Sequence, residues 1–472
     1  MPTTLIMKFG GTAVGMTTGL TQLLSIVLNE RPHWKRLLLV VSALEGVTDV
    51  LIETSHLAEM SNRRGYRRNV ATLRTRHLAL ISHLPLGDSE RSALEADLDR
   101  LLFDMLDLCE NLSDKVYTDQ TQVDAAIDAI VGVGERLAAR IVAALLRQNS
   151  LRSVAIDATD LIVTDSTYGN AVPNMQQTRE HIQHQLVPML DRNITPVITG
   201  FIGMSDTGKP TTLGRGGSDY TASILGACTN ANEVWIWTDV DGMMTADPRE
   251  VPNAVVIPTL SYAEVAELAY FGARILHQRM IKPLQESRIR LRVKNTFKPA
   301  LTGTLIEDLA ERSAKSFKAV TSTQGIGLTA STNGSLNNIT TLVNDCLYFL
   351  TGSHIEVLFT TQSATSTFTC YVIPTSAGLD ATRDLQVELQ RRLSEAGLDT
   401  TWRVHPVAIV TAIGSLDNTV NHKPLVQLLN ALEAVPLLTF GLNPSGTSIS
   451  LVTEFNYADV TLETIHNMIL SS

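Results

Sequence analysis

A lysine followed closely by two glycines lies near the start of the chain, between an apolar run and a helix-like stretch. The segment reads Lys8-Phe9-Gly10-Gly11-Thr12. Glycines let backbone N–H groups approach a phosphate closely, and a lysine supplies positive charge. The pattern indicates a phosphate-binding loop, although a plain Gly-Gly turn beside a solvated lysine is the commoner meaning of so short a motif.

A second glycine cluster reads GRGGSD over residues 214–219 and precedes a helix predicted over 220–231. Arg215 offers a fork of donors that can grip a carboxylate through two hydrogen bonds. Ser218 or Asp219 has a simpler alternative role as the cap of the helix. Because capping and ligand binding are compatible, this turn is a candidate site for a second anion.

Polar residues also follow other predicted elements. Thr238 and Asp239 close the apolar run Val-Trp-Ile-Trp, and open α/β folds bind ligands at the carboxyl ends of such strands. Nucleotide contact is the functional interpretation here, and an Asp-Gly turn is the alternative. Residues 42–49 (SALEGVTD) and the pair Gly134-Glu135 are further candidates, with a turn and a helix cap as their respective alternatives.

The sequence gives no pattern typical of a metal held by the protein itself. None of the eleven histidines has HExxH or paired metal-ligand spacing. His277 lies in an apolar stretch predicted to be helical, and we expect it to be packed there without a catalytic role. The cysteines, Cys109, Cys228, Cys346 and Cys370, are far apart and argue against a disulfide framework or a zinc site. We expect any metal to arrive with a nucleotide.

Length and composition limit the class of protein. At 472 residues the chain is too long for one compact core, so two or three domains are expected. A net charge of -10 offers no general attraction to nucleic acid. No run approaches the roughly 18 apolar residues of a membrane span, and the N-terminus lacks a secretory pattern. We expect a cytoplasmic protein that binds neither nucleic acid nor membrane.

Short β-rich runs alternate with helical stretches over residues 1–306. The predicted strands cover 5–9, 37–42, 196–200, 233–238 and 289–295. This alternation predicts an α/β domain with a mostly parallel sheet covered by helices. Strand signals nearly vanish over about 51–146, where apolar residues recur at helical spacing, so we expect a helical lobe beside the substrate site.

The remainder of the chain has a different pattern. Two stretches rich in Thr, Val, Ile and Leu, about 319–374 and 404–472, each combine strands with amphipathic helices, for example over 423–434. A further helix predicted over 382–396 lies between their cores. We therefore predict two small, related α/β modules at 317–400 and 401–472.

Seven segments taken in order resemble the aspartokinase family. They are KFGGTAVG at Lys8, VVSALEGVTD at Val40, GE at Gly134, TTLGRGGSDYTA at Thr211, WTDVDGMMTADPR at Trp237, FGARILH at Phe271 and VKNTFKPALTGTLI at Val293. Each motif is weak alone, but their order and spacing span the whole catalytic region. The resemblance implies the amino-acid kinase fold followed by two ACT modules.

The resemblance also implies roles for individual residues. The residues implied in catalysis are Lys8 and Asp219. The phosphate or ATP-binding residues are Lys8, Phe9, Gly10, Gly11, Thr238, Asp239, Met244, Arg249 and Arg274. The substrate-binding residues are Ser42, Thr48, Glu135, Arg215, Gly216, Gly217 and Ser218. No protein metal site is implied; the expected cofactor is ATP with magnesium.

The implied reaction is phosphorylation of the side-chain carboxylate of L-aspartate to 4-phospho-L-aspartate, the first step toward lysine, threonine and methionine. Glu135 can take the α-ammonium and Arg215 the α-carboxylate, which leaves the side-chain carboxylate free to attack the γ-phosphate. That carboxylate is already ionised at neutral pH, with a reference pKa of about 4, so no general base is needed. Lys8 and nucleotide-bound magnesium should offset the negative charge.

Several positions depart from the family pattern. Ala13 replaces a usual serine, Met244 a common tyrosine beside the adenine, and Arg274 a common lysine. These changes bear on nucleotide affinity and selectivity rather than on the reaction class. In the C-terminal part, the turn 334–338 precedes a strand in which Leu358 stands where effector-sensitive members carry aspartate. We therefore expect weak or absent inhibition by lysine.

Two alternatives remain open at this stage. One is a related carboxylate kinase that acts on another amino acid in a specialised pathway. The other is an amino-acid sensor whose ACT pair binds effectors while its kinase site is degenerate, although Lys8, Arg215 and Asp239 argue against degeneracy. The resemblance further implies a homodimer formed through the ACT modules. The length leaves no room for a fused homoserine dehydrogenase, so a monofunctional enzyme is expected.

Overall fold

The computed structural model describes residues 3–272, 276–308, 317–331, 336–351, 356–362, 366–373, 380–398, 402–414 and 423–471. The chain forms two compact units. The first contains the described residues up to Met243 together with Pro258–Tyr262 and Leu276–Asp308. The second contains the described parts of residues 244–257, 263–275 and 309–472. None of the helices in the described ranges is long and apolar enough to cross a membrane.

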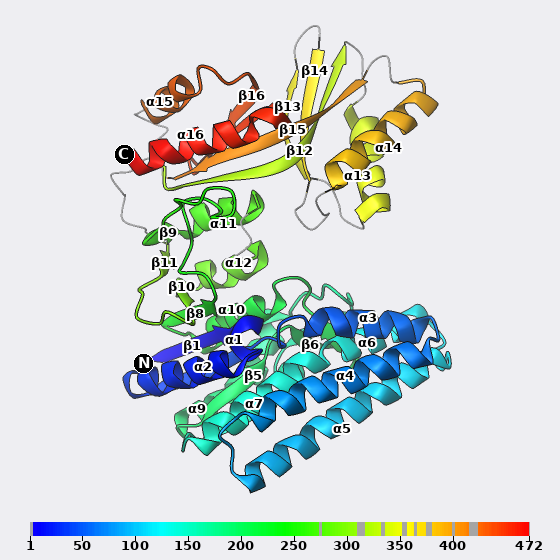
Figure 1. Ribbon diagram of the computed structural model, residues 1–472, viewed down its shortest axis with the longest axis vertical. Coiled ribbons are helices and arrows are strands. Elements are labelled where there is room, and N and C mark those ends of the chain that lie inside the picture. The colour runs from blue at the N-terminus through cyan, green and yellow to red at the C-terminus, as the bar shows by residue number, and fades with distance from the viewer. Residues whose placement is uncertain are drawn as a thin grey trace. The chain divides into compact units, whose positions relative to one another are not determined.

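The first unit is built on a mostly parallel eight-stranded sheet within the described residues (Figure 1). In spatial order its strands are β3 (Ser153–Ile156), β5 (Thr195–Thr199), β2 (Arg36–Val41), β1 (Thr4–Phe9), β8 (Glu233–Thr238), β10 (Arg290–Asn295), β11 (Thr304–Glu307) and β9 (Thr259–Ser261). Only the β10–β11 pair among them is antiparallel. The apolar runs of β1, β2 and β8 are buried almost throughout, as expected for strands covered on both faces.

Helices of this unit occupy the stretches between the strands. They are α1 (Gly11–Val14), α2 (Thr17–Glu30), α3 (Val47–Glu59), α4 (Arg63–Ser82), α5 (Asp88–Ser113), α6 (Gln120–Val131), α7 (Val133–Gln148), α8 (Met175–His181), α9 (Val187–Asp191), α10 (Gly217–Thr229) and α12 (Gln278–Glu286). Short turns are η1 (Arg31–His33), η2 (Ala158–Asp160) and η3 (Ile182–Leu186). The five predicted strands agree with β1, β2, β5, β8 and β10 to within one residue at each end.

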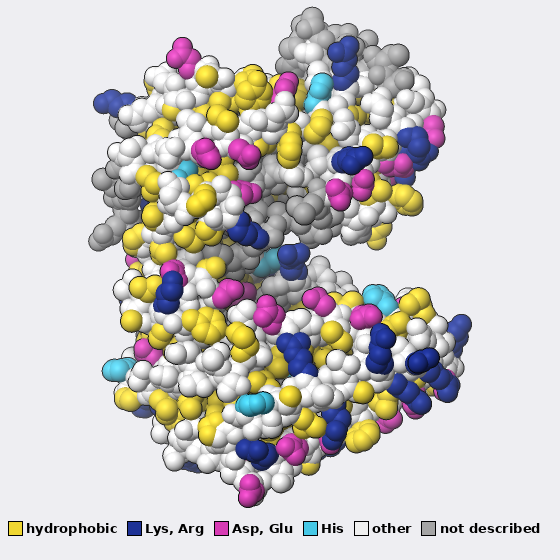
Figure 2. Space-filling model, viewed as in Figure 1, with side chains coloured by type: hydrophobic (Ala, Val, Ile, Leu, Met, Phe, Trp, Pro, Cys, Tyr) yellow, Lys and Arg dark blue, Asp and Glu magenta, His cyan; other side chains and the backbone are white. Residues whose placement is uncertain are grey.

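The stretch predicted to be helical over about 51–146 is helical, and comprises α3 to α7. Its longest members, α4 and α5, lie side by side in Figure 1. Ion pairs link their exposed faces, among them Arg67–Glu110 at 2.6 Å and Arg74–Asp99 at 2.7 Å. Figure 2 shows basic and acidic side chains interspersed over this lobe. Because exposed pairs contribute little individually, the apolar faces of these helices account for most of their stability.

A buried carboxylate ties the lobe to a small sheet of β4 (Val163–Thr164), β6 (Ile202–Ser205) and β7 (Pro210–Thr212). Asp128 on α6 accepts hydrogen bonds from the Gly169 N–H at 2.9 Å and the Thr212 N–H at 2.7 Å. Its other oxygen accepts from the Thr212 hydroxyl at 3.0 Å. Thr212 lies directly before the glycine cluster 214–219, so Asp128 anchors one end of that loop.

The second unit contains a six-stranded sheet within the described residues, in the order β13-β14-β12-β15-β17-β16. Its elements are α11 (Tyr262–Tyr270), β12 (Ala319–Ser331), α13 (Leu336–Thr351), β13 (Glu356–Gln362), β14 (Ser366–Val372), α14 (Ala381–Glu395), β15 (Trp402–Ile413), α15 (Lys423–Ala431), β16 (Leu437–Leu442), β17 (Ser448–Glu454), η5 (Phe455–Tyr457) and α16 (Ala458–Ser471). The order strand, helix, strand, strand, helix therefore occurs twice. Figure 1 shows α13 with α14 over one half of the sheet, and α15 with α16 over the other half. This repeat agrees with the two related α/β modules predicted from the sequence.

A segment from the predicted catalytic region packs as part of this second unit. Thr245 accepts a hydrogen bond from the Val320 N–H at 2.8 Å through its carbonyl, and its hydroxyl lies 2.8 Å from His466 Nε2. Ala246 and Val251 are buried in one apolar cluster with residues of the C-terminal sheet and helices. Residues 244–257 are thus held by the C-terminal core, although they precede it by many residues in the chain.

We expect Asp128→Ala to lower the free energy of unfolding by about 3 kcal/mol, because it leaves the buried N–H and hydroxyl of Thr212 without their acceptor and also removes the acceptor of the Gly169 N–H. Asp128→Asn keeps an acceptor oxygen and should cost about 1 kcal/mol. Urea unfolding measures both values, and hydrogen exchange at Gly169 and Thr212 reports the two affected N–H groups. Equal stability of wild type and Asp128→Ala would contradict the anchoring role.

Candidate active site

Lys8 lies at the carboxyl end of the central strand β1 and is largely buried, with 8% of its surface exposed. It pairs in register with Val40 of β2 and Ile236 of β8. Its Nζ atom lies 2.6 Å from Oδ1 of Asp219, in the first turn of α10. The structure therefore brings together both residues implied in catalysis, although more than 200 positions separate them in the sequence.

The glycines after Lys8 make a tight passage between strands. The Gly10 N–H donates to the Trp237 carbonyl at 3.2 Å, and α1 begins at Gly11. A Cβ atom at Gly11 would lie 2.9 Å from the Ala43 carbonyl oxygen, so a side chain at this position would require the backbone to move. The close approach of the Ala43 carbonyl thus requires glycine at position 11, and this requirement is compatible with a phosphate-binding role.

The second glycine cluster enters α10 through two left-handed residues, Gly214 with φ of 75° and Gly216 with φ of 72°. Gly216 is the N-cap, and no side chain caps the helix. The alternative in which Ser218 or Asp219 serves as the cap is therefore wrong. Both residues lie inside the first turn, where Asp219 is free to face Lys8.

A strained residue that the sequence analysis missed holds this loop. Phe201, just beyond β5, has a φ of 71°, a left-handed conformation that costs a bulky residue energy. Its N–H donates to the Thr221 hydroxyl at 3.0 Å, and its carbonyl accepts from the Leu213 N–H at 2.8 Å. Phe201 is thereby bonded to residues on both sides of the glycine cluster. No sequence pattern marks a phenylalanine for this conformation.

Glu135 is almost fully buried in the first turn of α7. One carboxylate oxygen accepts the Ala43 N–H at 3.1 Å, and the other has no hydrogen-bond partner within the described parts of the chain. Burial raises the pKa of Glu135 to about 7, against the opposing effects of the Ala43 hydrogen bond and the charge of Lys8. A buried, half-satisfied carboxylate is costly, and perturbed groups of this kind cluster at functional sites, so Glu135 is a candidate to bind a cationic group.

The other residues predicted to hold the substrate lie just after β2, in the first turn of α3 and at the start of α10. Ser42 follows β2 and donates its N–H to the Phe9 carbonyl at 3.1 Å, and Thr48 lies half-buried in the first turn of α3. Gly217 lies so close to Phe201 that a Cβ atom would be 2.7 Å from that ring. Arg215 is exposed, and no hydrogen bond or ion pair involves it among the residues that the structure describes.

Thr238 and Asp239 lie where β8 ends, beside the end of β1. Asn295, at the end of β10, donates to the Asp239 carbonyl at 3.0 Å and to Asp241 Oδ1 at 2.6 Å. The Lys298 ammonium lies 2.8 Å from Asp241 and, with Asn295, lowers the pKa of that carboxyl. Asn295 and Lys298, which the sequence analysis did not select, thus hold the loop that carries Asp239.

The other predicted nucleotide contacts lie outside the first compact unit or outside the described residues. Met244 and Arg249 belong to the second compact unit, and Arg249 forms an ion pair with Asp247 at 2.5 Å. Arg274 lies outside the described residues, as do Gly334 and Ser335 of the turn 334–338, whose other three residues begin α13. Their roles stay predictions.

His277 lies outside the helical interior expected for it, because it is the N-cap of α12 and accepts a hydrogen bond from the Arg279 N–H at 3.3 Å. Its Cβ would clash with a side chain at Gly216, which explains why that position is glycine.

No group of three or more potential metal ligands occurs in the part of the chain that the structure describes. The cysteines in these ranges are unpaired and buried.

The chain matches the model of the amino acid kinase family over residues 3–295. It is 32% identical to the aspartokinase of Chlamydia trachomatis over 303 residues, which covers 64% of each chain. It is 35% identical over 300 residues to the chloroplastic bifunctional aspartokinase/homoserine dehydrogenase 1 of Arabidopsis thaliana. That match covers 63% of this chain but 32% of the relative, so the chain spans well under half of that longer protein.

Solved structures extend the similarity to nearly the whole chain. Escherichia coli aspartokinase III in complex with aspartate and ADP is 26% identical, with a TM-score of 0.75 and coverage of 99% of this chain and 100% of that one. Its complex with lysine and aspartate gives a TM-score of 0.79 at the same identity, over 98% and 99% of the two chains. These relatives confirm the predicted resemblance to aspartokinases and the amino-acid kinase fold. With more than half of its length matched by the family model, the chain belongs to the amino acid kinase family.

Proposed function

We propose that the protein transfers the γ-phosphoryl group of ATP to the side-chain carboxylate of L-aspartate. The observation that carries this proposal is the grouping of a buried Lys8–Asp219 ion pair with Glu135, one oxygen of which is unpaired among the described residues. The first element suits a transferring phosphate and the second suits an amino acid's ammonium group. The similarity to aspartokinase III, whose solved complex contains aspartate and ADP, supports the same assignment.

Aspartate would be held by its backbone groups. Its α-ammonium would occupy the free side of Glu135, and its α-carboxylate would receive the guanidinium fork of Arg215. Ser42 and Thr48, on either side of the Ala43 that hydrogen-bonds to Glu135, would supply further polar groups, and Gly216, Gly217 and Ser218 would form the adjoining turn. The side-chain carboxylate would then be directed at the phosphate by its own geometry, which supplies the positioning part of catalysis.

Transfer itself would depend on charge neutralisation rather than on a general base. Lys8 would pair with the γ-phosphate, and the backbone around Gly10 and Gly11 would allow its close approach. Asp219 would hold Lys8 in place before the nucleotide binds. Thr238 and Asp239 would contact the nucleotide, together with Met244, Arg249 and Arg274. Magnesium bound to the phosphates would offset further charge, and no protein cage for it is needed.

The wider role follows from this chemistry. We infer a place at the start of amino-acid biosynthesis toward lysine, threonine and methionine, in the cytoplasm, with the protein acting as a homodimer formed through its C-terminal modules. A kinase for an N-acylated acid is disfavoured, because acylation removes the ammonium group that Glu135 would bind. A degenerate sensor is disfavoured by the preserved pairing of Lys8 with Asp219.

An acceptor comparison tests the proposed reaction. Purified protein with ATP and magnesium should release ADP with aspartate, and hydroxylamine should trap the acyl phosphate as a hydroxamate. Glutamate and N-acetylglutamate should give little turnover. Robust turnover of another acid together with inactivity toward aspartate would transfer the assignment to the alternative carboxylate kinase.

Lys8→Ala should reduce kcat by about 10³-fold, because it removes the charge that stabilises the transferring phosphoryl group. Lys282→Ala is the matched control, since Lys282 is an exposed lysine on α12 with only a weak pair to Glu286. The measurement is ADP release at saturating aspartate and ATP, with the fold of each variant verified by circular dichroism. Near wild-type turnover of Lys8→Ala would refute the mechanism.

Glu135→Gln should stabilise the free protein at high pH while abolishing aspartate binding. Burial raises the pKa of Glu135 to about 7 in the folded protein. At any pH between the ordinary pKa of a glutamate and 7, the carboxyl is therefore protonated in the folded protein but ionised in the unfolded chain. Wild-type stability therefore falls as the pH rises through this window, and levels off above it. The advantage of Glu135→Gln should grow by about 2 kcal/mol between pH 5 and 8.

Urea unfolding of the free protein at the two pH values measures this difference. Glu53→Gln is the control, because Glu53 is exposed on α3 and should show no such pH-dependent gain. A pH-independent difference between wild type and Glu135→Gln would contradict the raised pKa, and unchanged aspartate affinity would contradict the binding role.

A further inference from the structure

A hollow of about 710 Å³ lies in the first unit at the amino ends of its parallel strands. Four of its lining residues precede strands: Thr3 lies before β1, Lys35 before β2, Arg152 before β3 and Asn193 before β5. The turn after α2, Arg31 to Trp34, also lines it. Lys8 lies at the opposite, carboxyl end of β1. The hollow is therefore distinct from the proposed active site and has the volume of a small-molecule site.

Its lining carries one sign of charge. Arg31, His33, Lys35 and Arg152 contribute basic groups, and no aspartate or glutamate is among the lining residues. This is unusual in a chain with a net charge of -10. Of the carboxylates on adjoining segments, Glu30 accepts the indole N–H of the lining residue Trp34 at 3.2 Å, and Asp191 pairs with Arg36 at 2.6 Å.

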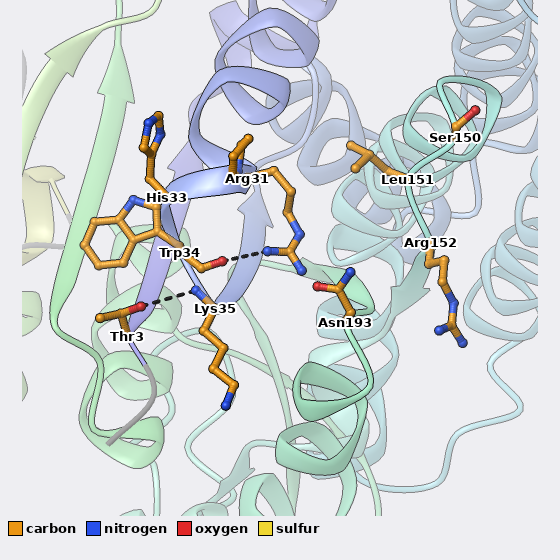
Figure 3. A pocket seen from close by; sticks show the side chains of 10 residues that line it. Thr3, Arg31, His33, Trp34, Lys35, Ser150, Leu151, Arg152 and Asn193 are labelled. Carbon is orange, nitrogen blue, oxygen red and sulfur yellow. Dashed lines mark hydrogen bonds between the residues drawn. The ribbon is translucent and has the colours of Figure 1, made fainter.

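Arg31 is the least solvated cation of the group. Its Nη1 donates to the Trp34 carbonyl at 2.6 Å, and no carboxylate pairs with it within the described ranges. Burial lowers the pKa of Arg31, as expected for a guanidinium that loses water without gaining an anion. Figure 3 shows this guanidinium directed toward Asn193, with the side chains of Lys35 and Arg152 extending on either side of Asn193.

The turns that present these groups are fixed by the sheet. Ser150 and Asn193 adopt left-handed conformations, with φ of 64° and 61°, in the turns that lead to β3 and β5. The Lys35 N–H donates to the Thr3 hydroxyl at 3.2 Å, and Arg152 Nη1 donates to the Arg192 carbonyl at 3.1 Å. Arg31 and Arg152 each donate one guanidinium N–H to a backbone carbonyl, and their remaining N–H groups are available to a ligand.

We propose that this hollow binds a small, multiply charged anion of the phosphate class, such as pyrophosphate or a phosphorylated metabolite. Two guanidinium groups supply paired N–H donors that match phosphate oxygens, and Lys35 and His33 add charge at the edge. The proposal is independent of the aspartate reaction, because none of these residues belongs to the proposed catalytic or binding set.

Isothermal titration of the full chain with pyrophosphate at fixed ionic strength tests the proposal. Pyrophosphate binding should persist in Lys8→Ala, because this change affects only the proposed catalytic loop. In the double variant Arg31→Gln/Arg152→Gln the affinity should fall at least tenfold, which corresponds to about 1.4 kcal/mol. The charge-matched control is Arg64→Gln/Arg68→Gln on α4, where both arginines are exposed. It should change the affinity by less than about twofold.

A second variant covers the case in which the double variant folds poorly. Asn193→Asp places a carboxylate within the hollow at a left-handed position that aspartate tolerates, so the fold should persist while pyrophosphate binding is lost. Absence of binding to wild type, loss of binding in Lys8→Ala alone, or equal loss in the test and control variants would each overturn the proposal. Turnover with aspartate and ATP should be unchanged by Arg31→Gln/Arg152→Gln, whichever way the pyrophosphate result falls.

Discussion

The ion pair between Lys8 and Asp219 is the interaction on which the proposed site depends. A lysine at the end of a central, buried strand requires a partner, since an uncompensated charge in such a place is costly. Asp219 supplies that partner from the first turn of α10, at 2.6 Å. The loop from Leu213 to Asp219 must therefore be placed accurately against β1, and much of the surrounding structure serves this placement.

Three features fix the loop, and each is unfavourable or demanding by itself. Asp128 is buried to anchor Thr212, Phe201 adopts a left-handed conformation to bond both ends, and Gly216 leaves space for His277. Glu135 adds a fourth unfavourable feature, because it keeps a carboxylate oxygen unpaired within the described residues. Such concentrations of strain and desolvation are typical of functional sites, where a ligand completes what the free protein leaves unsatisfied.

The strands and the central motifs could be predicted from the sequence because their signals are local. The apolar run before Lys8 and the glycines after it specify a strand and a tight turn without reference to the rest of the chain. The pairing of Lys8 with Asp219 could be anticipated only through the family resemblance, since the contact depends on the order of strands in the sheet. Phe201, Asn295 and Asp128 escaped prediction, because each acts through a distant backbone partner and has an ordinary sequence environment.

The assignment of residues 244–257 shows another limit of sequence reasoning. These residues come soon after β8, so the sequence pattern places them in the predicted catalytic domain 1–306. Their buried side chains, however, pack with Phe317, Ile465 and other residues of the C-terminal unit. Apolar residues such as Val251 do not reveal their partner from sequence, because hydrophobic burial is not directional.

The Lys8–Asp219 pair also bears on how a nucleotide would enter the site. Asp219 pairs with Lys8, the residue proposed to bind the γ-phosphate. A phosphate carries more negative charge than a carboxylate, so it would compete successfully for Lys8 and repel Asp219 at short range. Asp219 would then be displaced toward the solvent-facing side of its loop, where Arg215 lies four residues earlier in the chain. By this argument nucleotide binding would itself change the loop that receives the α-carboxylate, which favours ordered binding with the nucleotide first.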